Sequence, residues 1–262
     1  MSEEKVLIKD KGSVRLILLN RPRKKNAVDI EMYSMIGKAI ATADSDINIK
    51  VIVLSGTGSM FSSGNDLNNF GTALSSGQSL DQVAEQGRIM LQDFVRTIVL
   101  CSKILIAAVN GDGVGIMFTL LPLFDLVFCV HGAKFNAPFS RLGQTPEGCS
   151  TFTFPRIFGT SRATEILMLG DKVGVDEAKD QGIISQVLEP ENLLQYALKV
   201  AENLTMLQQT SILETKRLTG WDKQTLLKVN DEECRVLKER WQSPECLEAV
   251  TKFLTEKINS KL

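Results

Sequence analysis

Residues 104–121 read ILIAAVNGDGVGIMFTLL, and this stretch decides the fold. The continuous apolar run at 104–109 is typical of a strand buried on both faces. Three glycines within residues 111–115 allow a tight turn, and the apolar run from Ile116 onward predicts the start of a helix. A strand, a glycine-rich turn and a helix start leave backbone N–H groups free to meet a ligand. Such turns are also common as purely structural features, so both interpretations stay open at this point.

A similar strand and loop lie upstream. Residues 51–54 (VIVL) are another continuous apolar run, and the loop SGTGSMFSSGNDL follows at 55–67. This loop matches neither the dinucleotide-binding pattern nor the P-loop pattern. Its glycines let the backbone approach a ligand closely, which suits an anion or an oxyanion. Residues 29–44 show helical spacing with Asp29 as the N-cap, and the alternation of strand and helix indicates an α/β sheet with crossover connections.

Residues 143–150 read GQTPEGCS and place one carboxylate, Glu147, between a proline and a glycine. Phe139, Phe152 and Phe154 are close to it in sequence. A carboxylate in apolar surroundings is costly to ionise, so its pKa should rise. Such a group suits proton transfer near neutral pH. An ordinary acidic residue on a solvated loop fits the local composition equally well.

The rest of the chain supports a single α/β unit followed by helices. Residues 71–86 are rich in serine and glycine and are expected to be mobile. From residue 193 onward the pattern is helical and richly charged, so we divide the chain into a core at 1–200 and a C-terminal helical region at 201–262 that packs on it. The remaining elements are expected at residues 6–20 (a β-hairpin), 89–98 (a helix), 125–130 (a strand), 162–170 and 175–182 (helices) and 183–188 (a strand).

Composition excludes several classes of function. The 262 residues are 44% hydrophobic and 23% charged, as in an ordinary soluble globular protein, and the net charge is −1. No general basic field exists, so neither nucleic acid nor a membrane surface is an implied partner, and no apolar run reaches transmembrane length. Five scattered cysteines without a CxxC pair indicate reduced thiols. The single histidine, His131, precedes Gly132 and is interpreted as a turn residue.

Two short segments carry further signals. Residues 21–25 (RPRKK) hold four cations in five positions, which fits a solvated turn and an anion-binding loop equally well. The last three residues, Ser260, Lys261 and Leu262, match the tripeptide that the peroxisomal import receptor reads at a free C-terminus. We therefore expect this receptor as a partner and the peroxisomal matrix as the location.

Together these motifs resemble the enoyl-CoA hydratase/isomerase (crotonase) superfamily over nearly the whole chain. The resemblance is carried by residues 20–22 with 26–27, 61–67, 107–111 with Gly115, and 176–178 with Gly182. It implies a spiral of ββα units with a helical C-terminal region used in oligomerisation, as a homotrimer or a dimer of trimers. It also implies an acyl-CoA thioester as the ligand and no cofactor, since CoA is part of the substrate.

The resemblance assigns roles to individual residues. The backbone N–H groups of Ser63 and Ile116 would form an oxyanion hole, and Glu147 would be catalytic. The residues expected along the acyl-CoA are Arg23, Lys24, Lys25, Ala27, Ser62, Asn65, Asp66 and Leu67. Other acids are interpreted differently: Asp66 also shapes its loop, while Asp125 and Glu165 are structural.

Two departures from the family pattern narrow the expected reaction. Thr119 and Phe139 stand where hydratases carry their two catalytic glutamates, so hydration should be poor. The segment around Glu147 resembles the peroxisomal-type Δ3,Δ2-enoyl-CoA isomerases, which carry one glutamate there. The resemblance thus implies conversion of a 3-enoyl-CoA to the trans-2-enoyl-CoA in the β-oxidation of unsaturated fatty acids. A dienoyl-CoA isomerase, which needs additional acids, and a non-catalytic acyl-CoA-binding homologue are the alternatives.

Overall fold

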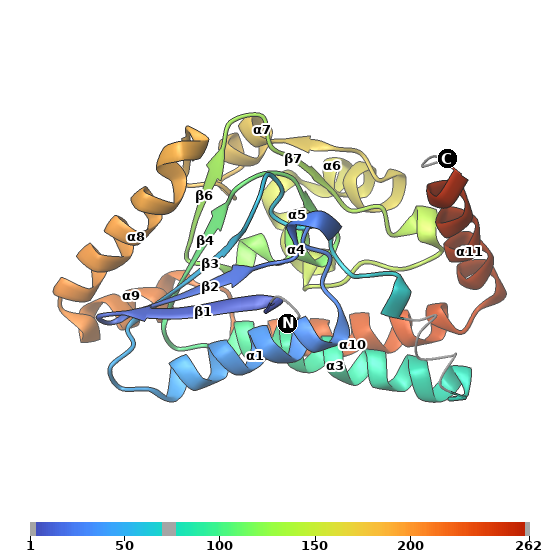
Figure 1. Cartoon of the computed structure of the whole chain (residues 1–262), viewed down its shortest axis with the longest axis horizontal. Helices are drawn as coiled ribbons and strands as arrows, with labels where there is room; N and C mark the ends of the chain where they lie inside the picture. The colour runs from blue at the N-terminus through green and yellow to red at the C-terminus, as the bar shows by residue number, and fades with distance from the viewer. Residues whose placement is uncertain (1–3, 70–76, 260–262) are drawn as a thin grey trace.

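The computed structural model describes residues 4–69 and 77–259, in which a large sheet and a small sheet are surrounded by helices (Figure 1). The first two strands of the large sheet pair antiparallel as the predicted hairpin, and every other neighbouring pair is parallel. Its strands, in order across the sheet, are β1 (Val6–Lys11), β2 (Val14–Leu19), β3 (Val51–Gly56), β4 (Ile104–Val109), β6 (Leu126–Val130) and β9 (Gln186–Leu188).

The small sheet explains the spiral course of the chain. It consists of β5 (Gly113–Val114), β7 (Lys134–Asn136) and β8 (Val173–Gly174), with β7 in the middle. The chain passes from β4 to β5 and from β6 to β7, so successive circuits give one strand to each sheet. Parallel bridges at Val28–Asn65 and Ser62–Gly113 extend the same stack toward the N-terminus. The expected α/β spiral is therefore confirmed.

Helices cover both faces of the large sheet, which is why β3 and β4 are continuously apolar. Figure 1 shows α8 on one side of the sheet and α1 on the other, and α8 packs against β2, β3, β4 and β6. The helices are α1 (Ile30–Ser45), α3 (Leu80–Leu100), α4 (Ile116–Thr119), α5 (Ser150–Phe158), α6 (Thr160–Thr164), α7 (Val175–Asp180), α8 (Pro190–Met206), α9 (Gln209–Thr219), α10 (Lys223–Trp241) and α11 (Pro244–Asn259). The short 3-10 turns are η1 (Pro22–Lys24), η2 (Leu121–Leu123) and η3 (Ser140–Leu142), and η4 (Glu165–Leu169) is a π-helical turn.

Local capping accounts for some helix starts that sequence patterns predicted and one that they missed. Asp29 caps α1 by accepting a hydrogen bond from the Met32 N–H at 3.0 Å, as expected. The expectation of an irregular segment up to residue 86 was wrong from Leu80 onward, because Ser79 and Gln82 form a capping box that starts α3 there. Residues 71–76 lie outside the described part of the chain. The helix α5 was not predicted, and it contains Pro155.

The C-terminal helices pack on the core. Figure 1 shows α1, α3 and α10 along one side of the molecule, and α3 contacts both α1 and α10. The helix α11 contacts η3 and α10. The expected boundary at residue 200 falls inside α8, which runs on to Met206. Within residues 4–69 and 77–259, no helix is both long and apolar enough to cross a membrane.

Candidate active site

Glu147 lies in the irregular segment between η3 and α5. Its carbonyl oxygen accepts hydrogen bonds from the Ser150 N–H (3.3 Å) and hydroxyl (2.7 Å). Gly148 and Cys149 both take left-handed conformations, with φ +70 and +62. A Cβ atom at Gly148 would lie 2.6 Å from Oγ1 of Thr119, so this turn packs directly on α4. Glycine at position 148 thus permits both the backbone conformation and the close approach.

The carboxylate of Glu147 is buried, with 7% of the residue exposed. Burial raises the pKa of Glu147 to about 8, the nearby Glu233 adds to the rise, and a hydrogen bond from the Ile116 N–H opposes it. Two of the neighbouring phenylalanines, Phe139 and Phe154, are also buried. The expectation of a raised pKa in apolar surroundings is confirmed, and the alternative of a solvated loop acid is wrong.

The structure brings the loops of Ser63 and Ile116 together. Ser62 accepts a hydrogen bond from the Val114 N–H at 3.0 Å and bridges Gly113 in the small sheet. Gly64 has φ +79, and a Cβ atom there would lie 2.5 Å from the Val114 carbonyl oxygen. Because only glycine fits this contact, the two glycine-containing loops stack directly on each other.

The two N–H groups expected to form an oxyanion hole already have acceptors in the structure. The Ile116 N–H donates to the Glu147 carboxylate. The Ser63 N–H donates to the Lys25 carbonyl oxygen at 2.9 Å. Lys25 itself is in a left-handed conformation with φ +53. A substrate oxygen would therefore have to replace or share both acceptors, and an N–H can share itself between two acceptors.

The two positions where hydratases carry glutamates hold uncharged side chains here. Thr119 is fully buried, and its hydroxyl donates back toward the Gly115 and Ile116 carbonyls, both at 3.3 Å. Phe139 is buried beside η3. Neither side chain has a carboxylate that could deprotonate water, as the sequence pattern predicts.

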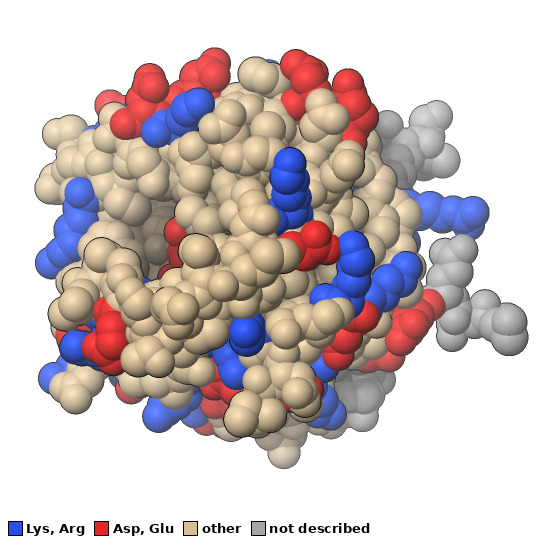
Figure 2. Space-filling model, turned by 90° about the vertical axis from the view of Figure 1, so that its left-hand side faces the viewer, with Lys and Arg blue, Asp and Glu red and all other residues tan. Residues whose placement is uncertain are grey.

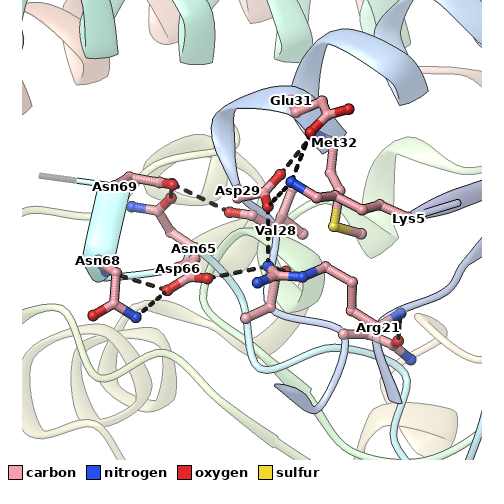
Figure 3. A network of polar contacts seen from close by, with 12 residues as sticks. Lys5, Arg21, Val28, Asp29, Glu31, Met32, Asn65, Asp66, Asn68 and Asn69 are labelled. Atoms are coloured by element: carbon pink, nitrogen blue, oxygen red, sulfur yellow. Dashed lines mark hydrogen bonds and ion pairs between the residues drawn. The ribbon is translucent and has the colours of Figure 1, made fainter. Parts of the chain in front are cut away.

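A polar network holds the loop that contains Ser63 (Figure 3). The Arg21 guanidinium donates to the Ala27 carbonyl at 2.6 Å and to the Asp66 carboxylate at 3.1 Å, and it lies 3.4 Å from Asp29. Asp66 also accepts from the backbone and side chain of Asn68. Burial raises the pKa of Asp66, but these hydrogen bonds outweigh it and leave the pKa below its usual range. The interpretation that Asp66 shapes the loop is confirmed.

The residues expected along the acyl-CoA surround this network. Asn65 bridges Val28, and its side chain accepts from Asn69 at 2.9 Å. Leu67 is partly buried, whereas Ala27 and Ser62 are buried. Ser62 contributes its hydroxyl to the Asn26 carbonyl at 2.7 Å.

The three cations at the start of the same region, Arg23, Lys24 and Lys25, are exposed. No ion pair involves them among the described residues. Figure 2 shows that cations and carboxylates intermingle on the face it presents, in keeping with the net charge of −1. Any anion bound by these three side chains would thus meet a local cluster rather than a broad basic field.

The two other acids considered from the sequence, Asp125 and Glu165, make contacts that stabilise the fold. Asp125 accepts from the Leu105 N–H at 2.7 Å and pairs with Lys216 at 2.8 Å. Glu165 pairs with Arg162 on the surface at 2.8 Å. The interpretation of both acids as structural is confirmed.

The single histidine, the cysteines and the C-terminal tripeptide are the other features considered from the sequence. His131 is exposed. All five cysteines are free and buried. Ser260, Lys261 and Leu262 lie outside the described residues.

Sequence reasoning missed one buried acid, Glu233 of α10, which is 5% exposed. It accepts hydrogen bonds from Cys149 and Thr151, at the beginning of α5. A signal was present in the sequence: Glu233 falls on the helical stripe of Leu226, Asn230, Leu237 and Trp241, which faces the core. An acid on the apolar face of a charged helix predicts burial with specific partners.

A solved structure has the same architecture. The enoyl-CoA hydratase/isomerase from Pseudoalteromonas atlantica T6c is 28% identical to this chain, with a TM-score of 0.86 over 97% of this chain and 98% of that one. The fold is therefore that of the enoyl-CoA hydratases and isomerases.

Sequence comparisons indicate the same family as the solved structure. The family profile described as enoyl-CoA hydratase/isomerase matches residues 9–261. The chain is 40% identical to enoyl-CoA delta isomerase 2 of Rattus norvegicus over 96% of this chain and 64% of the rat protein. It is 38% identical to the peroxisomal enoyl-CoA delta isomerase 3 of Mus musculus, over 98% of this chain and 80% of that protein. This protein belongs to the enoyl-CoA hydratase/isomerase family, and it spans about two thirds of the length of the rat relative.

Proposed function

We propose that this protein is a Δ3,Δ2-enoyl-CoA isomerase that acts in the β-oxidation of unsaturated fatty acids. The observation that carries the proposal is the buried carboxylate of Glu147, which lies against the Ile116 N–H and beside the loop of Ser63. The names of the rat and mouse relatives support the same reaction.

The reaction needs one group that first removes a proton and then returns it. In a 3-enoyl-CoA, the thioester and the double bond both acidify C2. Ionised Glu147 removes a C2 proton, and the electron pair moves into a dienolate whose negative charge rests largely on the thioester oxygen. Protonated Glu147 then returns the proton at C4, which leaves the double bond between C2 and C3. Atoms and charge balance without a second acid.

The two backbone donors would stabilise the dienolate. Placing the thioester oxygen on the Ile116 N–H removes the hydrogen bond that this donor makes to Glu147. That bond lowers the pKa of Glu147, so its loss makes the carboxylate a stronger base as the substrate binds. The Ser63 N–H would either leave the Lys25 carbonyl or be shared between that carbonyl and the thioester oxygen. Loss of one oxyanion donor typically costs about 100- to 1,000-fold in rate.

The uncharged side chains of Thr119 and Phe139 favour isomerisation over hydration. Addition of water needs groups that position and deprotonate the water, and neither side chain can do so. Glu233 is a further buried acid, but its two oxygens already accept three hydrogen bonds. It does not supply the free additional acid that a dienoyl-CoA isomerase requires.

The test is the conjugation of 3-hexenoyl-CoA, followed by ultraviolet absorbance, with wild type and Glu147→Gln. A general base typically contributes about 100- to 10,000-fold, so the variant should lose at least that much turnover while still binding acyl-CoA. Glu191→Gln, an exposed acid of α8, is the matched control. Unchanged turnover in Glu147→Gln would remove Glu147 from the mechanism. Binding of acyl-CoA by a wild type without turnover would favour the non-catalytic homologue instead.

We further propose that the acyl-CoA lies along Arg23, Lys24, Lys25, Ala27, Ser62, Asn65, Asp66 and Leu67, with the three cations near its phosphates. Because Asp66 is held by Arg21 and Asn68, its contribution would come from its backbone. Reversing the charge of Lys24 should weaken CoA binding, which isothermal titration calorimetry with CoA would measure, and unaltered affinity would reject its role.

We also propose that the protein resides in the peroxisomal matrix as a homotrimer or a dimer of trimers. The location is supported by the tripeptide Ser260-Lys261-Leu262 and by the name of the mouse relative. Deleting this tripeptide from a fluorescent fusion should abolish peroxisomal import, and retained import would argue against it. Light scattering should give a mass three or six times the 28.9 kDa of one chain.

A further inference from the structure

The carboxylate of Glu233 holds the turn that carries Glu147. Its Oε2 accepts a hydrogen bond from the Cys149 N–H at 2.7 Å. Its Oε1 accepts from the N–H and the hydroxyl of Thr151, at 2.9 and 2.6 Å. All three partners are donors, so they favour the ionised carboxylate over the protonated acid. Burial raises the pKa of Glu233 to about 7, and the same three hydrogen bonds counteract that rise.

These contacts take the place of a local helix cap. The N-terminal end of α5 has no side-chain cap from its own segment, because its N-cap residue is Cys149. Backbone N–H groups at a helix start need acceptors, and a negative charge there is favourable. The acceptor comes from α10, whose Glu233 is 84 positions from Cys149 in sequence. The start of α5 is therefore fixed by a helix distant in sequence.

Glu147 is tied to the same turn. Its carbonyl oxygen accepts both donors of Ser150, the first residue of α5. Between Glu147 and α5 stand two left-handed residues, Gly148 and Cys149. A non-glycine residue in this conformation is strained and persists only where its surroundings hold it. Two contacts with α10 hold Cys149: its N–H donates to Glu233 at 2.7 Å, and its thiol donates to the Leu226 carbonyl at 3.4 Å.

We propose that Glu233 is a positioning residue that fixes the turn 147–151 so that the Glu147 carboxylate meets the substrate in a productive geometry. This inference rests on the proposed isomerase function. Glu233 touches neither substrate nor reacting atoms, since its oxygens are occupied by Cys149 and Thr151. It acts through Glu147 in two ways, by fixing the backbone and by placing a negative charge near it.

The charge effect distinguishes this role from simple capping. The ionisable groups around Glu147 and Glu233 are Cys149 and Cys234, together with Tyr33 of α1, which interacts with Glu147. The negative charge of Glu233 raises the pKa of Glu147. Removing that charge should therefore lower the pKa of Glu147 as well as loosen its position. A purely structural cap would change stability and leave both the pKa and the turnover of the folded enzyme unaltered.

The experiment compares wild type, Glu147→Gln and Glu233→Gln at a temperature where circular dichroism shows all three folded. Glutamine keeps the shape of Glu233 but turns an NH2 group toward at least one N–H donor. Misplacement of a catalytic group by about 1 Å costs about 100-fold, so kcat of Glu233→Gln should fall about 10- to 100-fold with KM within about threefold. The pKa of Glu147, measured by NMR on 13C-labelled glutamate and assigned with Glu147→Gln, should fall.

The matched control is Glu232→Gln, the neighbouring acid on α10, whose exposed side chain pairs with Arg235. It should leave kcat and the pKa of Glu147 unaltered. Turnover and a Glu147 pKa that are unchanged in Glu233→Gln would overturn the positioning role, even where stability falls.

The experiment distinguishes failure of the proposed isomerase function from failure of the positioning role of Glu233. If wild type turns over and Glu147→Gln does not, the proposed function stands and the Glu233→Gln result judges the positioning alone. If wild type does not turn over, the proposed function fails, and the NMR titration still decides whether Glu233 acts on Glu147. If Glu233→Gln does not fold, Thr151→Val takes its place, because it removes the hydroxyl donor that lies 2.6 Å from Glu233. This variant should lower both kcat and the pKa of Glu147. If neither quantity changes, the proposal is contradicted.

Discussion

Replacing Glu147 by glutamine should change the pH dependence of folding stability as well as activity. The ordinary pKa of a glutamate is 4.5, and burial raises that of Glu147 to about 8. The folded state therefore keeps a proton that the unfolded chain releases between these pH values, so stability is fully present below about pH 4.5 and is lost as the pH rises toward 8. Over the whole interval from pH 4.5 to about 8, the free energy of unfolding falls by about 5 kcal/mol.

Over an accessible range the effect remains large. Between about pH 5 and pH 7.5, ionisation of Glu147 should lower the wild-type free energy of unfolding by about 3 kcal/mol. Glu147→Gln should not show this fall in the free energy of unfolding. It should show only the smaller fall due to Glu233, whose pKa burial raises to about 7. The pH dependence is the informative quantity, because the new amide also alters the contact with the Ile116 N–H at every pH.

Urea unfolding followed by tryptophan fluorescence at the two pH values would measure this difference, with Glu191→Gln as the exposed control. If wild type and Glu147→Gln lose the same free energy of unfolding as the pH rises, then burial does not raise the pKa of Glu147. The argument for a general base tuned by its surroundings would then be refuted.

Three further predictions follow from the same contacts. Because Glu147 must be ionised to act as the base, kcat/KM for 3-hexenoyl-CoA should rise about tenfold per pH unit below about 8 and level off above it; a flat profile between about pH 6 and 8 would contradict this. Gly148→Ala, with φ +70 and a Cβ atom 2.6 Å from Thr119, should lower both stability and kcat, whereas Gly174→Ala, which meets nothing within 4 Å, should lower neither in thermal-melt and turnover assays. Arg21→Met removes a donor from the Ala27 carbonyl and from the partly buried Asp66 and should cost about 1–3 kcal/mol by urea unfolding, and a cost below about 0.5 kcal/mol would show that the network in Figure 3 does not hold the loop.

Local patterns were sufficient wherever one short segment carries its own cause. The runs of apolar residues at β3 and β4 predict buried strands because helices cover both faces of the sheet. Asp29 predicts the start of α1 because the cap and its N–H partner are three residues apart. Glu147 could be singled out because its proline, glycine and aromatic neighbours already indicate an unusual environment.

Other parts of the site could not be predicted because their partners are distant in sequence. The acceptor of the Ser63 N–H is the Lys25 carbonyl, and the cap of α5 is a side chain of α10. Helix α5 itself escaped prediction because its first turn is stabilised from outside and it contains Pro155.

The sequence by itself determined the α/β class, the family resemblance, the two glycine loops and the identity of the one candidate base, since these depend on residue type and short spacing. Only the tertiary structure decided that Glu147 is buried against the Ile116 N–H and that Glu233 holds its turn. The physical reason is that burial and hydrogen bonding set the pKa and position of an acid, and both arise from chain segments that meet only after folding.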